Sequence, residues 1–185
     1  MEKALVVIKP DGMEKAVVGR VISKFEEGGL KVVGIKMLNA DKKLVGRHYI
    51  ADENWLFSVG KSAKAADAKR GIVNNETERE IGMRIRSYLI NELTRLPVIA
   101  MVLEGKDANK TARKIAGATE PKSADPDTIR GMLSTDTYKL ADSEKRSIRN
   151  IVHVSDSPKS ASREIKVWFR PSELYKYRTT GRQNR

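Results

Sequence analysis

The chain contains two histidines, and one of them, His153, stands where an imidazole could do chemistry. The run Ile151-Val-His-Val154 predicts a short buried strand, because β-branched residues flank the imidazole on both sides. Ser157 can cap a following helix, and Pro158 suits the first position of that helix. A neutral imidazole at this strand exit can act as a base, a metal ligand or a nucleophile. An isolated histidine, by contrast, is more often a core residue bonded to a backbone carbonyl.

Several basic and hydroxyl side chains lie at the boundaries of predicted elements rather than on exposed helix faces. Guanidinium forks and threonine hydroxyls are the groups that a protein uses to hold several phosphate oxygens. Taken singly, each of these residues is typical of a solvated surface. Together with a strand-end histidine they indicate phosphoryl transfer through a phosphohistidine. The residues in question are Lys9, Arg113, Thr119, Thr128, Arg130 and Arg149.

The surrounding pattern predicts the elements that must position these side chains. Near-continuous β-branched runs predict strands at residues 4–9, 31–38 and 97–104, in addition to the strand that holds His153. Periodic apolar residues and caps predict helices in between, including one capped by Asp41 and one that starts near Asn75 with Glu78 as its capping-box partner. The element order is β-α-β-α-(insert)-β-α-β-α. This order predicts an α/β sandwich in which helices pack on a small sheet.

Three segments depart from this regular alternation. Within residues 58–95, the run from Ser62 to Ala68 mixes alanine with charge and predicts an exposed helix, whereas Ile81, Ile85, Leu89 and Leu93 form a stripe that should pack on the core. Residues 118–149 are rich in loops. The tail from residue 170 to 185 is basic.

Composition narrows the class of protein. A chain of 185 residues suits one domain, and no apolar run approaches the roughly 20 residues that span a bilayer. The sequence has no cysteine, so disulfides, thiolate metal sites and a catalytic thiol are excluded. The net charge of +12 favours polyanionic partners. With no signal-peptide pattern at the start, a cytoplasmic protein without membrane contact is expected.

One phosphate-binding motif can be discarded. Gly60-Lys-Ser62 matches the end of a P-loop, but position 55 is tryptophan where that motif needs glycine, and no strand precedes it. Any phosphates would therefore be held by side chains.

These residues and their order resemble the nucleoside diphosphate kinase family over nearly the whole chain. The resemblance implies a ferredoxin-like α/β (α+β) sandwich with a four-stranded antiparallel sheet, formed by one domain of residues 1–185. It also implies ping-pong transfer of the γ-phosphate from a nucleoside triphosphate to a nucleoside diphosphate, with Mg²⁺ as cofactor and a homo-oligomer, a hexamer or smaller. The matching stretches are Lys9-Pro-Asp-Gly12, Val18-Gly19, Gly28-Gly-Leu30, His48-Tyr49, residues 98–105, Gly117-Ala-Thr119, Thr128-Ile-Arg-Gly131, Arg149-Asn-Ile-Val-His153 and Ser155-Asp-Ser157.

The resemblance also implies a role for each matching residue. His153 corresponds to the nucleophile, and Tyr49 and Glu164 correspond to its supporting partners. Lys9 and Asn150 correspond to residues that bond the sugar hydroxyls, and Lys9 also reaches the transferred phosphate. The phosphate-holding positions correspond to Arg113, Thr119 and Arg130. No clustered protein ligands for the metal are implied, although Asp156 could touch it through water.

Three features depart from the family pattern. Val154 replaces the glycine that usually follows the histidine, and valine would be strained there if its φ were positive. The loop of residues 131–149 is long. Because the segment at residues 58–95 is enlarged, the family pattern does not match one position to the aromatic residue that stacks on the base. Trp55 is the preferred choice, with Phe57 and then Tyr88 as alternatives.

Two other functions fit parts of the sequence. A nucleic-acid-binding module would suit the charge, but such modules stack bases on strand aromatics, and the strands at 4–9, 31–38 and 97–104 contain none. A nucleic-acid contact is therefore expected only as a secondary property of the basic tail. A second alternative is an inactive relative, which the presence of His153 and its basic partners opposes.

Overall fold

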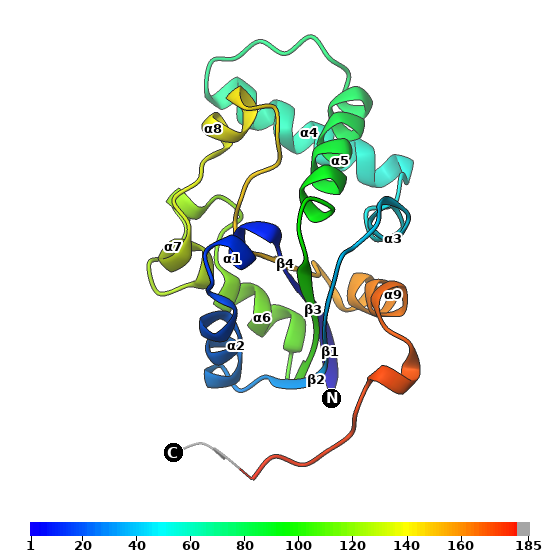
Figure 1. Cartoon of the computed structure of the whole chain (residues 1–185). Coiled ribbons are helices and arrows are strands. Elements are labelled where there is room, and N and C mark those ends of the chain that lie inside the picture. The colour runs from blue at the N-terminus through cyan, green and yellow to red at the C-terminus, as the bar shows by residue number, and fades with distance from the viewer. Residues whose placement is uncertain (181–185) are drawn as a thin grey trace.

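The computed structural model describes residues 1–180, which form an antiparallel sheet covered by helices on both faces (Figure 1). The sheet has four strands in the order β2-β3-β1-β4. The strands are β1 (Glu2–Ile8), β2 (Lys31–Leu38), β3 (Val98–Gly105) and β4 (Val152–Val154). All three pairings are antiparallel. The α+β sandwich with a four-stranded antiparallel sheet is thus confirmed.

The central strand β1 is buried on both faces, which explains its unbroken apolar run. Successive side chains of a strand point to opposite faces, so Ala4, Val6 and Ile8 enter one core and Leu5 and Val7 the other. His153 pairs with Val7 in the register of β1 and β4. The nucleophile predicted from sequence is therefore fixed beside a strand whose residues 4–8 are all buried.

Helices supply the other half of each core. Phe25 and Ala112 pack in the core with Ala4, from helices α2 and α6, and Leu93 and Trp168 pack in the opposite core, from helices α5 and α9. The α-helices are α1 (Pro10–Glu14), α2 (Val18–Glu27), α3 (Lys42–His48), α4 (Glu53–Lys69), α5 (Glu78–Leu93), α6 (Ala108–Ala116), α7 (Ile129–Leu133), α8 (Tyr138–Ser143) and α9 (Pro158–Trp168), and two 3₁₀ turns are η1 (Pro121–Ser123) and η2 (Pro171–Glu173). No helix within residues 1–180 is long and apolar enough to cross a membrane.

Several predicted caps are confirmed, and one is wrong. The side chains of Asp41 and Ser157 accept backbone N–H groups at the starts of α3 and α9. The α5 capping box, however, is built by Thr77 with Glu80, not by Asn75 with Glu78. Both pairs have the same spacing, and Thr77 is the one whose backbone is extended just before the helix.

The segment 58–95 lies in two helices that pack along each other, and the predicted helix at residues 62–68 falls within α4, where each of these residues is exposed or only partly buried. Helix α4 begins at Glu53, because the Asp52 side chain caps it, and it packs along α5. A Cβ on Gly60 would lie 1.7 Å from the Glu78 carbonyl oxygen, and one on Gly82 would lie 2.3 Å from that of Leu56. Glycines therefore let the two helices approach closely. Of the predicted stripe, Ile81 and Leu93 are buried, whereas Ile85 and Leu89 are only partly buried.

The described part of the basic tail lies against strand β2. Val33 stands at a bulge between β2 and β3, and its carbonyl accepts the Tyr175 N–H at 2.8 Å. The Lys36 ammonium bonds both oxygens of the Glu173 carboxylate. The predicted tail thus packs on the sheet edge, and its last five residues, 181–185, lie outside the described residues.

Candidate active site

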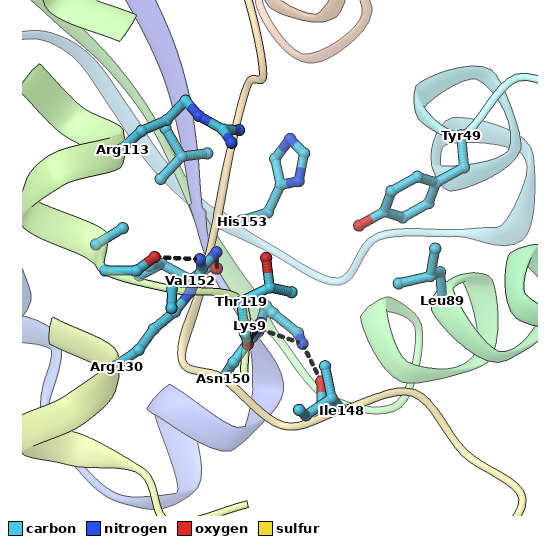
Figure 2. A pocket seen from close by; sticks show the side chains of 14 residues that line it. Lys9, Tyr49, Leu89, Arg113, Thr119, Arg130, Ile148, Asn150, Val152 and His153 are labelled. Atoms are coloured by element: carbon cyan, nitrogen blue, oxygen red, sulfur yellow. Dashed lines mark hydrogen bonds between the residues drawn. The ribbon is translucent and has the colours of Figure 1, made fainter. Parts of the chain in front are cut away.

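A cavity of about 280 Å³ opens beside β4. Figure 2 shows His153 between the guanidinium of Arg113 and the phenol of Tyr49. Most of the residues predicted from sequence line this cavity: Lys9, Tyr49, Arg113, Thr119, Arg130, Asn150 and His153, together with Leu89, Ile148, Val152, Val154 and the stretch 116–118. Among residues 1–180, the lining contains three cationic side chains and no carboxylate. Such a lining favours an anionic ligand.

The imidazole of His153 is oriented by a buried carboxylate. Its Nε2 lies 3.0 Å from Oε2 of Glu164, on helix α9. The Ser155 hydroxyl donates to the same oxygen at 2.7 Å, and Arg163 donates to the other oxygen at 3.2 Å. A carboxylate accepts only, so Nε2 carries the proton and Nδ1 keeps its lone pair. Glu164 therefore leaves Nδ1 as the nitrogen that keeps a lone pair.

A second histidine packs against the first without competing for its carboxylate. The ring of His48 lies edge-to-face with that of His153, at a centroid distance of 4.4 Å. Its Nδ1 accepts the indole N–H of Trp168 at 3.1 Å. Burial lowers the pKa of His48 well below its ordinary value, and the neighbouring His153 and Arg163 act in the same direction. His48 is therefore neutral and leaves Glu164 to His153.

His48, His153 and Glu164 are the one group of histidine and acidic side chains in the described chain that lie close enough to share a metal ion. Their facing atoms are already engaged in hydrogen bonds with each other, with Ser155 and with Trp168. The group thus serves to orient an imidazole.

Lys9 is held at the end of β1 by the segment that precedes His153. Its Nζ donates to the Ile148 carbonyl at 2.7 Å and to the Asn150 side-chain oxygen at 3.0 Å (Figure 2). The Asn150 amide donates in turn to the Thr119 carbonyl at 2.8 Å. Lys9 is 4% exposed, and burial lowers its pKa. These bonds bring Lys9, Asn150 and Thr119 together from three distant parts of the chain.

The strained position in the histidine loop is Ile151 and not Val154. Ile151 has φ of 69°, which is rare for a β-branched residue and costs about 1–3 kcal/mol. Its N–H donates to Asp11, and its carbonyl accepts the Lys9 N–H, both at 2.8 Å. Val154 is an ordinary strand residue that pairs with Val6. The kink at Ile151 lets Asn150 and His153 both line the cavity.

The two predicted phosphate-holding arginines differ in their surroundings. Arg130 donates to the carbonyls of Gly117 at 2.8 Å and Val152 at 2.9 Å. Burial lowers the pKa of Arg130 to about 10, and the nearby Arg113 adds to this effect. Arg113 comes from the last turn of α6 and points toward His153 (Figure 2). The positions of both suit a ligand with several negative oxygens.

Of the other predicted residues, Glu164, Trp55 and Phe57 lie outside the cavity lining, whereas Tyr49 forms part of it. Glu164 stands behind His153. Trp55 lies on α4 with its ring 6.3 Å from that of Tyr49, and Phe57 on the same helix is 56% exposed. Tyr49 is an aromatic neighbour of His153 at a centroid distance of 6.0 Å, and burial raises its pKa. No hydrogen bond links Tyr49 to His153 within residues 1–180.

The comparisons with known proteins agree with this geometry. The family model described as "Nucleoside diphosphate kinase" matches residues 2–59 and 63–174. A curated nucleoside diphosphate kinase of Pyrobaculum aerophilum is 41% identical over 179 residues, which covers 94% of this chain and 98% of that protein. The chain belongs to the nucleoside diphosphate kinase family. It is therefore an enzyme of nucleotide phosphotransfer.

Solved structures support the same relationship. The crystal structure of an NDP kinase from Pyrobaculum aerophilum superposes with a TM-score of 0.90 at 39% identity, covering 95% of this chain and 99% of that one. A transition-state mimic of the nucleoside-diphosphate kinase from Borrelia burgdorferi, with vanadate and ADP, superposes with a TM-score of 0.78 at 34% identity, covering 97% of this chain and 93% of that one.

Several residues of the site were not predicted to be functional. Ser155 shares Glu164 with His153, and its place two residues after His153 on an extended stretch was a usable signal. Asp11 holds Ile151 and lies in the quoted Lys9-Pro-Asp-Gly12 stretch. The bond from Trp168 to His48 joins residues 120 positions apart, and no local pattern predicts it.

Proposed function

We propose that this kinase transfers the γ-phosphate of a nucleoside triphosphate to a nucleoside diphosphate by a ping-pong mechanism through phospho-His153. One observation carries the proposal. In the described part of the chain, the His153 imidazole has one nitrogen held by Glu164 and no hydrogen bond to the other, and it lies in a cavity whose three charged lining residues, Lys9, Arg113 and Arg130, are all cationic.

The proposed reaction has two matched half-steps. In the first, Nδ1 of His153 forms a bond to the γ-phosphorus while the bond to the bridging oxygen breaks, and the nucleoside diphosphate leaves. In the second, a terminal oxygen of another diphosphate attacks the phosphorus and the imidazole leaves. Lys9, Arg113 and Arg130 neutralise the charge on the phosphate oxygens, while Thr119 and Asn150 position the nucleotide. Glu164 stabilises the imidazole as it gains positive charge.

Mg²⁺ would enter with the nucleotide. The cavity lining offers no carboxylate to a cation that prefers oxygen ligands, so the phosphates themselves would supply most ligands. We keep Asp156 as the candidate for a water-mediated contact, because the pKa of its carboxyl group is lowered. Burial alone would raise this pKa, but hydrogen bonds with Ser160 and Ser157 and the charges of Arg113 and His153 outweigh burial. The bound ion would neutralise phosphate charge during transfer.

An aromatic residue of α4 would stack on the base. We keep Trp55 for this role, supported by its place beside Tyr49. Phe57 is the alternative, supported by its exposure on the same helix.

We also propose that the enzyme is a cytoplasmic homo-oligomer, a hexamer or smaller. Strand β2 is an edge strand that the tail covers at Val33. Its Ile35 and Met37 side chains are exposed, and an exposed apolar stretch of an edge strand favours pairing with another copy. We propose a nucleic-acid contact only for the basic tail. The described part of the tail lies on β2 and lines no part of the cavity, so such a contact would be separate from the candidate active site.

Transfer of phosphate from ATP to GDP in the presence of Mg²⁺ tests the proposed function. We expect GTP and ADP in equal amounts, with parallel double-reciprocal lines for the two substrates, as a ping-pong mechanism requires. Absence of GTP formation by folded protein would refute the proposed function. Intersecting lines would refute the covalent mechanism.

A further inference from the structure

The long loop between Arg130 and Asn150 is closed at its base by one carboxylate. Asp136 Oδ2 accepts Nη1 of Arg146 at 2.6 Å, and Oδ1 accepts Nη2 at 3.0 Å. Oδ2 also accepts the backbone N–H of Arg149 at 2.7 Å. Asp136 is 9% exposed, so this is a bidentate, largely buried ion pair, of the geometry in which such pairs are strongest.

The pair fixes the backbone from Ser147 to Arg149. Arg146 donates to the Ser147 carbonyl at 3.0 Å. Ser134 donates to the Arg149 carbonyl at 2.6 Å, and the Asp136 N–H donates weakly to the Ser134 hydroxyl at 3.4 Å. These bonds hold Ser147 and Arg149, the two neighbours of Ile148, and Arg149 also precedes Asn150. The Ile148 carbonyl and the Asn150 side-chain oxygen both accept Lys9 Nζ. The carboxylate therefore sets where the Lys9 ammonium is held.

Asp136 also acts on Lys9 through its charge. The charged groups that influence the Lys9 ammonium are Asp11 from α1, Glu92 from α5, Arg130 from α7 and Asp136 from the loop. Burial lowers the pKa of Lys9, the three carboxylates oppose that effect, and Arg130 reinforces it. Removing the charge of Asp136 should thus lower the pKa of Lys9 further.

We propose that Asp136, through its ion pair with Arg146, is a positioning residue that holds Lys9 in place for phosphoryl transfer. In this role Asp136 does not touch the reacting atoms itself. It acts through the backbone at Ile148 and Asn150. The kinetic consequence rests on the proposed function, in which Lys9 reaches the transferred phosphate. The effect on Lys9 itself does not depend on that function.

The same loop supplies a matched control. Asp142 on α8 forms an ion pair with Arg70 of α4, at 2.8 Å. Its side chain is about half exposed, and it holds no part of the segment from Ser147 to Asn150. Asp142→Asn therefore removes one carboxylate of this loop without touching the partners of Lys9.

The test compares Asp136→Asn, Arg146→Lys and Asp142→Asn with the parent enzyme. The first readout is kcat and KM for ATP and GDP from pH 6 to 10, with thermal unfolding to verify the fold. The second readout is the pH titration of the Lys9 side chain by NMR of ¹³C-labelled lysine, assigned with Lys9→Arg.

We expect Asp136→Asn to lower kcat by about 10- to 100-fold with a smaller change in KM, since a small misplacement of a positioning group costs this much. The alkaline limb of kcat and the Lys9 titration should both move to lower pH, because charged Lys9 is lost earlier as pH rises. Arg146→Lys should lie in between, since lysine keeps a charge but lacks the bidentate fork. Asp142→Asn should match the parent.

Parent-like kcat and Lys9 titration in a folded Asp136→Asn enzyme would overturn the inference. If Asp136→Asn unfolds, the same two readouts are taken from Arg146→Lys, and a parent-like kcat and Lys9 titration in that variant would overturn the inference. An equal loss in Asp142→Asn would also overturn it, because any change in the loop would then suffice. If the parent transfers no phosphate, the proposed function fails, while the Lys9 titration still tests the positioning role.

Discussion

At the scale of single residues, one oxygen atom organises the chemistry. Oε2 of Glu164 receives both His153 Nε2 and the Ser155 hydroxyl. The buried His48 lies 3.9 Å from the same oxygen, yet its Nδ1 is bonded by Trp168. A charged His48 would compete for the carboxylate. Burial keeps His48 neutral and leaves Glu164 to His153, the proposed nucleophile.

His48 should leave a measurable trace in the pH dependence of stability. Burial holds its pKa in the folded state below the ordinary value of about 6.5, so the unfolded state binds the extra proton first as pH falls. The contribution of His48 to the free energy of unfolding is at its maximum above pH 6.5. Below that pH it declines by about 1.4 kcal/mol per pH unit until the pKa of the folded state is reached. Urea unfolding at several pH values measures this slope.

His48→Asn is the matched variant, because its side-chain oxygen can still accept from Trp168. We expect lower stability overall but a shallower decline between pH 6.5 and 5 than in the parent. Identical slopes in the two proteins would contradict a neutral, buried His48.

The two arginines should show the geometry that a phosphate demands. Replacing Arg113 or Arg130 with alanine should lower kcat/KM by about 10²-fold or more, because charge on the phosphate oxygens would lose its partner. Lysine should restore only part of the loss, since it lacks the fork. Steady-state kinetics measures kcat/KM for each variant. An alanine variant with the kcat/KM of the parent would show that the replaced arginine does not hold a phosphate.

At the scale of elements, the apolar stripe of helix α5 packs in the core at some positions and lines the cavity at another. Its ends are buried through Ile81 and Leu93, whereas Leu89 lines the cavity. The sequence shows four equivalent apolar positions, because periodicity reports a helix face and not what lies opposite it. The stripe therefore supports both the core and the wall of the active site.

The same substitution at two positions of α5 should separate these tasks. Leu93→Ala should cost about 2–5 kcal/mol in the free energy of unfolding, since Leu93 is fully enclosed in the core. Leu89→Ala should cost clearly less and should instead raise the KM for nucleotides, because it alters the cavity wall. Urea unfolding and steady-state kinetics check both, and the reverse order of the two costs would show that the burial is misassigned.

At the scale of the whole molecule, the sequence predicts what depends on local pattern. The strands and the caps at Asp41 and Ser157 follow from alternation and capping chemistry, and the site residues follow from the family resemblance. Helices α1, α7 and α8 were missed, because five or six residues show less than two turns of periodicity. The Ile151 kink and the Trp168–His48 bond depend on residues far apart in the chain.

The sheet and both helical layers hold one imidazole nitrogen at the cavity where we propose that a phosphate binds. Incubation of the protein with γ-labelled ATP and Mg²⁺, followed by peptide mapping, tests this proposal most directly. The account predicts one label on the peptide that contains His153, labile in acid and stable in base, as a phosphoramidate is, and its complete transfer to added GDP. The His153→Ala variant should carry none. Transfer at the parent rate by that folded variant, with no label on His153 in the parent, would contradict the account.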